Sequence, residues 1–197
     1  MKIYNSIVSW IIKKRIHQIK LFINHPHEVQ EELRQSLVNK AKNTDFGRTH
    51  DFNSIKNQKD FSERIPLHKY EDLEPYIYRM RSGEQNVLWP SKIKWFAKSS
   101  GTSNSKSKFI PLSYEALEEC HYKGGKDMLS LYYNNNPNSK LLNGKCLRLG
   151  GSQELYQSGN TYFGDLSAII IDNLPLWAEF SSTPSQKTSL IPEWEYK

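Results

Sequence analysis

Residues 99–108 read SSGTSNSKSK, a small, hydroxyl-rich segment that lies between two runs typical of β-strands. The run before it, residues 93–97, is aromatic and partly alternating, and the run after it, residues 109–112, is apolar and contains a proline. This arrangement predicts a polar loop held between two neighbouring strands.

The composition of this loop suits the binding of an anion. Gly101 lets the backbone approach a ligand closely, and either Lys106 or Lys108 can neutralise negative charge. The hydroxyl groups that can donate to phosphate oxygens belong to Ser99, Ser100, Thr102 and Ser103. The loop is not a Walker A motif, because Lys106 stands where that motif requires its second glycine. A triphosphate-binding turn and an ordinary solvated hairpin both fit this pattern.

Segments on both sides of the loop add a family resemblance. They are residues 43–50, 65–71, 75–77, 83–84 and 88–90 upstream, and 121–125 and 147–151 downstream. Together with the loop they resemble the Gretchen Hagen auxin-responsive family of acyl acid amido synthetases, which belongs to the adenylate-forming superfamily. The two downstream segments resemble the bacterial branch of that family.

The resemblance spans nearly the whole chain and implies an α/β fold, the amino-terminal portion of an adenylate-forming large domain, with two leading helices before mixed strands and helices. Residues 1–197 would form the first part of one adenylating domain, with a helical lead-in over 1–50 and the phosphate loop and part of the acyl pocket over 51–197. The implied enzyme is an ATP-dependent, amide-forming ligase. A complete enzyme would be longer, so this chain by itself is expected to be inactive.

The same resemblance implies the site residues and partners. The residues that would hold the phosphates of ATP are Ser99, Ser100, Gly101, Thr102, Ser103 and Lys108. Mg²⁺ would bind outside this chain, and no catalytic residue or metal ligand is assigned within it. The acyl pocket would use the helix after Ser113 and the aromatic pair Tyr162-Phe163. The expected partners are a small carboxylic acid, an amine or amino acid, and the rest of the enzyme downstream of Lys197, with no nucleic acid and no membrane.

The sequence also departs from the family pattern. Asn104 and Ser105 stand where family loops usually carry glycine. The later signatures of such enzymes, a Tyr-Gly-x-x-Glu turn and a Gly-Asp segment, are absent from residues 1–197. Plant relatives read the carboxylate of their acid with an arginine on the helix that corresponds to residues 114–133, where this chain has only Lys123 and Lys126 as cations. The identity of the acid is therefore left open.

Charge leaves other classes of function open. The net charge of +6 and the pI near 9.1 fit a nucleic-acid binder, a membrane-surface protein or an anion-handling enzyme. The lysines are spread along the chain, and the only dense cluster, residues 13–15, is typical of a solvated basic surface. One alternative is a basic nucleic-acid-binding module in which Trp95 and Phe96 stack on bases. Another is a catalytically silent interaction domain.

Cysteine and histidine spacing gives no metal motif. Cys120 and Cys146 are far apart and form no C-x-x-C pair, which favours a reduced, cytoplasmic chain with two buried thiols. The six histidines include no H-E-x-x-H motif.

The beginning of the chain predicts two helices. Isoleucines recur at helical spacing from Ile3 to Ile23, with lysines between them, so an amphipathic helix should end near Asn24. Pro26 should begin a second helix, whose apolar stripe runs from Val29 to Ala41. We expect both helices to pack on one core, although a basic amphipathic helix can also lie on a membrane.

Later segments predict a mixture of elements. Residues 54–80 should form short helical pieces broken by Pro66 and Pro75. A helix should run from Tyr114 into Tyr132, and Gly124-Gly125 within it predicts the close approach of a neighbour or a ligand. Its apolar face should contain Leu117, His121, Gly124, Met128 and Leu131. Beyond it we expect a strand at 145–149, a glycine loop at 150–152 and a helix through 169–171.

Overall fold

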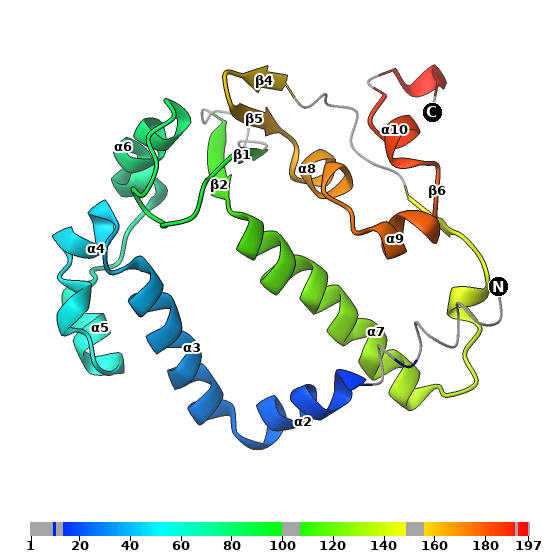
Figure 1. The fold of residues 1–197 in the computed structure, drawn as a ribbon, viewed down its shortest axis with the longest axis horizontal. Coiled ribbons are helices and arrows are strands. Elements are labelled where there is room, and N and C mark those ends of the chain that lie inside the picture. The colour runs from blue at the N-terminus through cyan, green and yellow to red at the C-terminus, as the bar shows by residue number, and fades with distance from the viewer. Residues whose placement is uncertain (1–9, 11–13, 100–106, 149–155, 192, 197) are drawn as a thin grey trace. The chain divides into compact units, whose positions relative to one another are not determined.

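The computed structural model describes residue 10 and residues 14–99, 107–148, 156–191 and 193–196 (Figure 1). The chain divides into two compact units. We call residues 21–114 with 158–161 the hairpin unit, and residues 1–20, 115–157 and 162–197 the long-helix unit. Helices and strands alternate irregularly along the chain, so the expected α/β class is confirmed.

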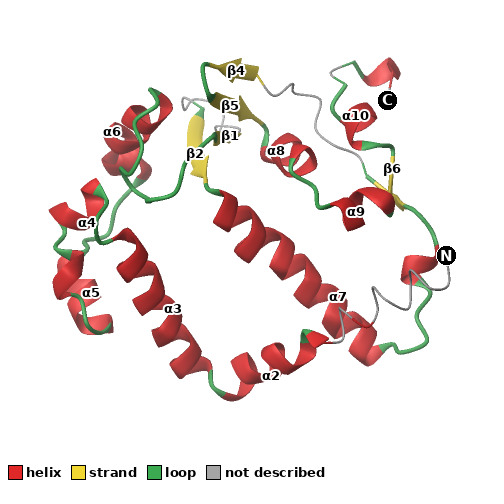
Figure 2. Ribbon diagram, viewed as in Figure 1, coloured by secondary structure: helices red, strands yellow, loops and turns green. Residues whose placement is uncertain are grey.

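The hairpin unit is mainly helical until it reaches a pair of strands (Figure 2). Its elements are α3 (Pro26–Ala41), α4 (Asp45–Thr49), η1 (Phe52–Ser54), α5 (Gln58–Arg64), α6 (Tyr70–Arg81), β1 (Trp95–Ser99) and β2 (Lys108–Leu112). Helix α2 (Ile16–Asn24) leads into it from the long-helix unit.

The long-helix unit is built around one extended helix. Its elements are the π-helix η2 (Ala116–Tyr122), α7 (Lys123–Asn135), η3 (Leu141–Asn143), β3 (Cys146–Leu147), α8 (Leu166–Asp172), α9 (Leu176–Phe180), β6 (Ser182–Thr183), α10 (Gln186–Ser189) and η4 (Trp194–Tyr196). Strands β4 (Tyr156–Ser158) and β5 (Thr161–Gly164) also belong to it except for Ser158 and Thr161, which are counted with the hairpin unit. Within this unit, β3 and β6 pair in parallel.

The two predicted strands form an antiparallel pair. Strand β1 pairs with β2 so that Trp95 faces Leu112 and Ser99 faces Lys108, in a sheet of order β2-β1-β5-β4. Strand β2 is therefore an edge strand, and its Pro111, which has no N–H group, is tolerated because edge strands do not need every donor. The prediction of a loop joining two neighbouring strands is confirmed for the strands, while residues 100–106 lie outside the described residues.

A tight turn joins α3 to α4 and depends on one glycine. Thr44 is fully buried; its hydroxyl donates to the carbonyl of Ala41 over 2.6 Å and accepts the backbone N–H of Gly47 over 2.9 Å. A Cβ atom at Gly47 would lie 2.1 Å from the Ala41 carbonyl oxygen. Only glycine fits this position, because the obstacle is backbone and cannot swing away.

We expect Gly47→Ala to lower the free energy of unfolding by roughly 1–3 kcal/mol, because the added methyl group forces α4 away from the end of α3. The matched control is Gly124→Ala in α7, where nothing lies within 4 Å of the added Cβ. That change should stabilise the chain by about 0.5–1 kcal/mol, since alanine favours helix. Urea unfolding of both variants measures the difference. Equal effects of the two substitutions would contradict this assignment.

Helix α6 continues through Pro75, so the expected break there is wrong. The proline lies in the first half of the helix and removes only the N–H group that would bond the carbonyl of Glu71. The helix ends at Arg81, with Ser82 as its C-cap residue, and Gly83 follows with a φ of +99°. Gly83 donates to the carbonyl of Met80, and Glu84 donates to that of Arg79, which is the pattern of a Schellman cap.

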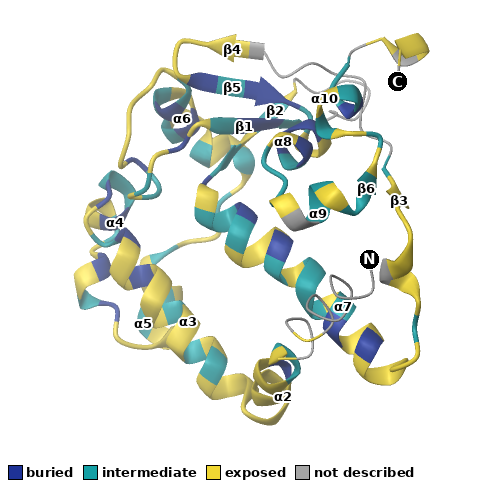
Figure 3. Ribbon diagram, turned by 45° about the vertical axis from the view of Figure 1, so that its right-hand side comes forward, coloured by how far each residue is buried: buried dark blue, intermediate teal, exposed yellow. Residues whose placement is uncertain are grey.

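The helix after Ser113 exists as predicted, but its buried face is different. Its first part, η2, is wound as a π-helix, which inserts one residue and rotates everything that follows. The buried residues are Leu117, Tyr122, Ser130 and Tyr133. Met128 and Leu131, expected on the same apolar face as Leu117, are 66% and 41% exposed. Figure 3 shows buried and exposed positions alternating along α7.

The expectation that a neighbouring segment approaches Gly124-Gly125 closely is also wrong, while the alternative, the approach of a ligand, stays a prediction. Added Cβ atoms at these two positions would meet no atom within 4 Å. The glycines therefore face open space and make room for no described neighbour.

The two leading helices do not share one core in the described part of the chain. Ile19 of α2 is buried within the long-helix unit, whereas Ile23 is 67% exposed. In α3 only Val38 and Ala41 are buried, and they pack with residues of η1 and the segment after it. The predicted apolar stripe is thus used only at the carboxyl end of α3, as Figure 3 shows.

One member of the basic cluster at 13–15 has a specific partner. Arg15 forms a two-pronged ion pair with Asp127 of α7, and its side chain is only 12% exposed. This residue therefore contributes to packing within the long-helix unit and does not add to a solvated basic surface.

Candidate functional site

The two ends of the predicted phosphate loop lie side by side. Ser99 closes β1, Lys108 opens β2, and the two residues are directly opposed in the strand register. Ser100, Gly101, Thr102 and Ser103 lie outside the described residues. The hairpin therefore fixes where the loop begins and ends.

Helix α6 holds the edge of this hairpin. The hydroxyl group of Tyr70 accepts the backbone N–H of Phe109 over 2.9 Å and donates to the carbonyl of the same residue over 3.4 Å. At the other end of α6, the guanidinium of Arg81 lies 3.8 Å from the ring centroid of Phe109. Both ends of one helix thus contact the second residue of β2, immediately beside Lys108.

Lys108 itself is paired with α6. Its ammonium lies 3.0 Å from Oε1 of Glu71 and 4.9 Å from the ring centroid of Tyr70. The backbone N–H of Glu71, and then the ammonium of Lys108, hold the pKa of the Glu71 carboxyl below its usual range. The carboxylate is therefore charged at neutral pH. Both side chains remain accessible, at 39% exposed for Lys108 and 62% for Glu71.

We expect Tyr70→Phe to lower the free energy of unfolding by roughly 1–2 kcal/mol, because it removes two hydrogen bonds to the edge strand. Tyr78→Phe on the same helix is the matched control, since Tyr78 is 67% exposed, and it should change stability by less than about 0.5 kcal/mol. Chemical denaturation measures both, and protection of the Phe109 amide in hydrogen exchange should fall only in Tyr70→Phe. If hydrogen-exchange protection of the Phe109 amide were unchanged in Tyr70→Phe, the hydrogen bond between Tyr70 and Phe109 would be contradicted.

The upstream motifs meet around one aromatic ring. Phe46 of α4 lies 4.2 Å from His50, 6.0 Å from Phe52, 5.7 Å from His68 and 5.6 Å from Tyr76, measured between ring centroids. These five residues come from three of the segments quoted for the resemblance and from η1. The aromatic residues of those segments therefore pack against one another around Phe46.

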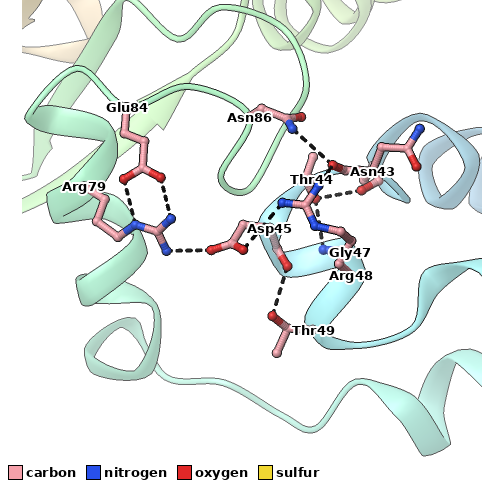
Figure 4. Close-up of polar contacts among 10 residues, drawn as sticks. Asn43, Thr44, Asp45, Gly47, Arg48, Thr49, Arg79, Glu84 and Asn86 are labelled. Atoms are coloured by element: carbon pink, nitrogen blue, oxygen red, sulfur yellow. Dashed lines mark hydrogen bonds and ion pairs between the residues drawn. The ribbon is translucent and has the colours of Figure 1, made fainter.

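Charged residues join the same segments on their polar side (Figure 4). Arg79 of α6 donates to Asp45 over 2.6 Å and to both carboxylate oxygens of Glu84, at 2.8 and 2.5 Å. Its hydrogen bond to Glu84, and then that to Asp45, raise the pKa of Arg79, and Arg79 lowers that of Glu84. The backbone N–H of Asp45 also donates to the carbonyl of Asn86. This network ties α4, α6 and the turn after α6 together.

We expect the fold to lose stability in acid. Several carboxyl groups have a lowered pKa in the folded protein: Glu31, Asp51, Asp60, Glu71, Glu84 and Glu179. A lowered folded pKa stabilises the fold above the unfolded value, and this contribution is lost as pH falls through the folded value. Burial raises the pKa of Asp172, which acts in the opposite sense.

The urea midpoint should therefore stay level from about pH 7 to 5 and fall below about pH 4.5, where carboxyl groups begin to protonate. Glu84→Gln should flatten this decline, because it removes one contributing carboxyl group. A midpoint that rises on acidification would contradict the assignment.

In the long-helix unit, the residues expected to line an acyl pocket have different environments. Phe163 is buried, whereas Tyr162 is partly exposed. The hydroxyl of Tyr122 donates to the carbonyl of Ile170 over 2.9 Å, which attaches the long helix to α8. The accessible large apolar side chains of α7 are Met128, Leu131 and Tyr132.

The exposure of the two cysteines and of Phe96 differs from the sequence expectation. Cys120 and Cys146 are free thiols, as expected, but both are exposed and neither is buried. Phe96 is fully buried, so a stacking platform made of Trp95 and Phe96 is wrong. The glycine loop at 150–152 lies outside the described residues.

No three histidine, cysteine or carboxylate side chains in the described ranges come together as a metal site. Among the described helices, none is long and apolar enough to cross a membrane.

The comparison with known families agrees with this geometry. Residues 15–197 match the model of the GH3 family N-terminal domain. The chain belongs to the GH3 family. This is the Gretchen Hagen family that the loop and its flanking segments resemble.

Curated relatives from plants are similar over parts of the chain. The indole-3-acetic acid-amido synthetase GH3.5 of Arabidopsis thaliana is 29% identical over 119 residues, which are 60% of this chain and 19% of that protein. The jasmonoyl-L-amino acid synthetase JAR4 of Nicotiana attenuata is 25% identical over 170 residues, 85% of this chain and 28% of that protein. The chain thus spans less than a third of the length of either relative.

Solved structures share the fold. The GH3.15 acyl acid amido synthetase has a TM-score of 0.70 and 21% identity, over 83% of this chain and 29% of that one. A second structure, AtGH3.15 in complex with 2,4-DB, has a TM-score of 0.62 and 22% identity, over 74% of this chain and 25% of that one. The chain therefore has the fold of the amino-terminal portion of these proteins, as the sequence predicted.

In the sequence, Tyr70-Glu71 belongs to a segment that carries the family resemblance, and its residue types alone indicate no role in the site. The structure brings both residues to the loop's last lysine. The signal that was available is local: an acidic residue in the first turn of a helix is favoured by the helix dipole and stays charged. What a sequence cannot show is that this GH3 helix packs its first turn against β2.

Proposed function

We propose that the chain is the amino-terminal part of an ATP-dependent acyl acid amido synthetase. The observation that supports this most directly is the β1–β2 hairpin, which brings Ser99 and Lys108 together at the two ends of a hydroxyl-rich loop in a GH3 domain. In the reaction, the carboxylate oxygen of an acid attacks the α-phosphate of ATP, and pyrophosphate leaves. An amine then attacks the acyl adenylate, giving the amide and AMP.

In this proposal the loop binds the departing phosphates. The residues that would hold the β- and γ-phosphates are Ser99, Ser100, Gly101, Thr102, Ser103 and Lys108. Hydroxyl and backbone N–H groups would donate to the phosphate oxygens, and the ammonium of Lys108 would offset the charge that develops on pyrophosphate. Mg²⁺, which neutralises further phosphate charge when bound, would be held by residues outside 1–197. Most of the catalytic effect would come from positioning and charge neutralisation.

The proposed substrates are a small carboxylic acid and an amine or amino acid. The names of the relatives, indole-3-acetic acid-amido synthetase and jasmonoyl-L-amino acid synthetase, support this class. The exposed apolar residues of α7, Met128 and Leu131, would contribute to the acyl pocket. Because residues 114–133 lack arginine, the carboxylate would be read by another cation than in the plant enzymes.

We extend the proposal to organisation and location. Residues 1–197 form the first part of one adenylating domain, with 1–50 as lead-in and 51–197 carrying the phosphate loop and part of the acyl pocket. Residues 121–125 and 147–151 support membership of the bacterial branch. The free thiols of Cys120 and Cys146 favour a cytoplasmic enzyme, since that compartment keeps thiols reduced.

Acid-dependent ATP–pyrophosphate exchange tests the function. In an enzyme of full family length that carries this segment, Lys108→Ala should slow exchange roughly 10- to 1,000-fold, because a lysine that neutralises transition-state charge is worth about 1.4–4 kcal/mol. Lys106→Ala is the matched control and should change the rate much less.

Residues 1–197 without the rest of the enzyme should catalyse no exchange, because the adenine and metal sites lie elsewhere. Equal losses in the two lysine variants would show that the loop is wrongly aligned. Exchange by the 197-residue chain would overturn the divided site.

A further inference from the structure

The ammonium of Lys108 already has an anionic partner within the fold. Glu71 Oε1 lies 3.0 Å from Nζ, at a distance typical of a charged hydrogen bond. The pair is well placed, because the Tyr70 hydroxyl group fixes the backbone of Phe109 beside Lys108 and the Tyr70 ring lies under the ammonium.

The same pair is easily separated. Its side chains are 39% and 62% exposed, and exposed ion pairs are weak because water and salt screen them. A polyphosphate carries several charges and offers many acceptor oxygens, so it is a stronger partner for an ammonium than one solvated carboxylate. The carboxylate and the polyphosphate cannot both hold the same ammonium closely without repelling each other.

From these contacts we propose that Glu71 is a positioning residue of the phosphate loop. It holds the Lys108 ammonium at the foot of the loop when no phosphate is bound, and it competes with the phosphate for that ammonium. This inference rests on the phosphate role proposed for Lys108. It adds that Glu71 weakens ground-state binding of the polyphosphate while it holds the ammonium of Lys108 beside the first turn of α6.

The test measures binding of inorganic tripolyphosphate to the 197-residue chain by isothermal titration calorimetry at fixed ionic strength. Glu71→Gln should bind roughly 3- to 10-fold more tightly than the unaltered chain, because a competing like charge is removed. Glu71→Asp, which keeps the charge, should remain close to the unaltered affinity. Glu74→Gln, an exposed carboxylate on the same helix, controls for the change in net charge and should alter affinity less than about 1.5-fold.

A double-mutant cycle isolates the pair. In a Lys108→Met background, tripolyphosphate should bind more weakly, and the added Glu71→Gln should give no further gain. Damage to the fold would not make Glu71→Gln bind tripolyphosphate more tightly only when Lys108 is present. Circular dichroism melting confirms that each variant is folded at the temperature of titration.

The outcomes separate this inference from the proposed function. If the chain binds tripolyphosphate through Lys108 but Glu71→Gln binds equally or more weakly, the competition is overturned and the phosphate role of Lys108 stands. If Glu71→Gln gains affinity to the same extent with Met at position 108, the effect is general charge and the inference is overturned. If neither the unaltered chain nor Glu71→Gln binds, the phosphate role of Lys108 and the inference both fail.

Discussion

The close approach of α4 to the end of α3 is the constraint on which the hairpin unit depends. It is possible only because residue 47 has no Cβ, so that the Ala41 carbonyl can lie where a side chain would begin. The buried hydroxyl of Thr44 makes hydrogen bonds with the carbonyl of Ala41 and the N–H of Gly47, two backbone groups that the turn shields from water. Since unsatisfied buried polar groups are costly, the threonine and the glycine are needed together.

From this turn, one set of contacts leads to the β1–β2 hairpin, whose strands flank the proposed phosphate loop. The turn places Phe46 among the aromatic rings and presents Asp45 to Arg79, which fixes α6. Helix α6 then holds β2 through Tyr70 and Arg81, so the start of β2 and its lysine are positioned from one side. The segments that carry the family resemblance upstream of the loop are thus explained mostly as its support, while residues 99–108 carry the proposed contacts to phosphate.

Features set by local rules were predictable from the sequence. The two strands around the loop and the start of α3 at Pro26 follow from alternation and proline chemistry. The proline at position 75 shows the limit of such rules, because packing of α6 against β2 outweighs the loss of one hydrogen bond. The ion pair between Glu71 and Lys108 joins residues 37 positions apart, and no periodicity encodes it. The phosphate-binding role of the loop still rests on its composition and on the family.

The long helix shows most clearly how one local irregularity changes a surface. In a regular α-helix, the residues that follow Leu117 on its face would be His121, Gly124 and Met128. The π-helical segment makes Tyr122 the next buried residue instead, and its hydroxyl then reaches the carbonyl of Ile170. As a result, the side chain of Met128 is exposed, and no atom lies within 4 Å of a Cβ added at Gly124. The inserted residue therefore decides which apolar side chains the helix exposes, and with them which ones it would offer to the proposed acyl pocket. Single-turn π-helical segments are often found at functional sites.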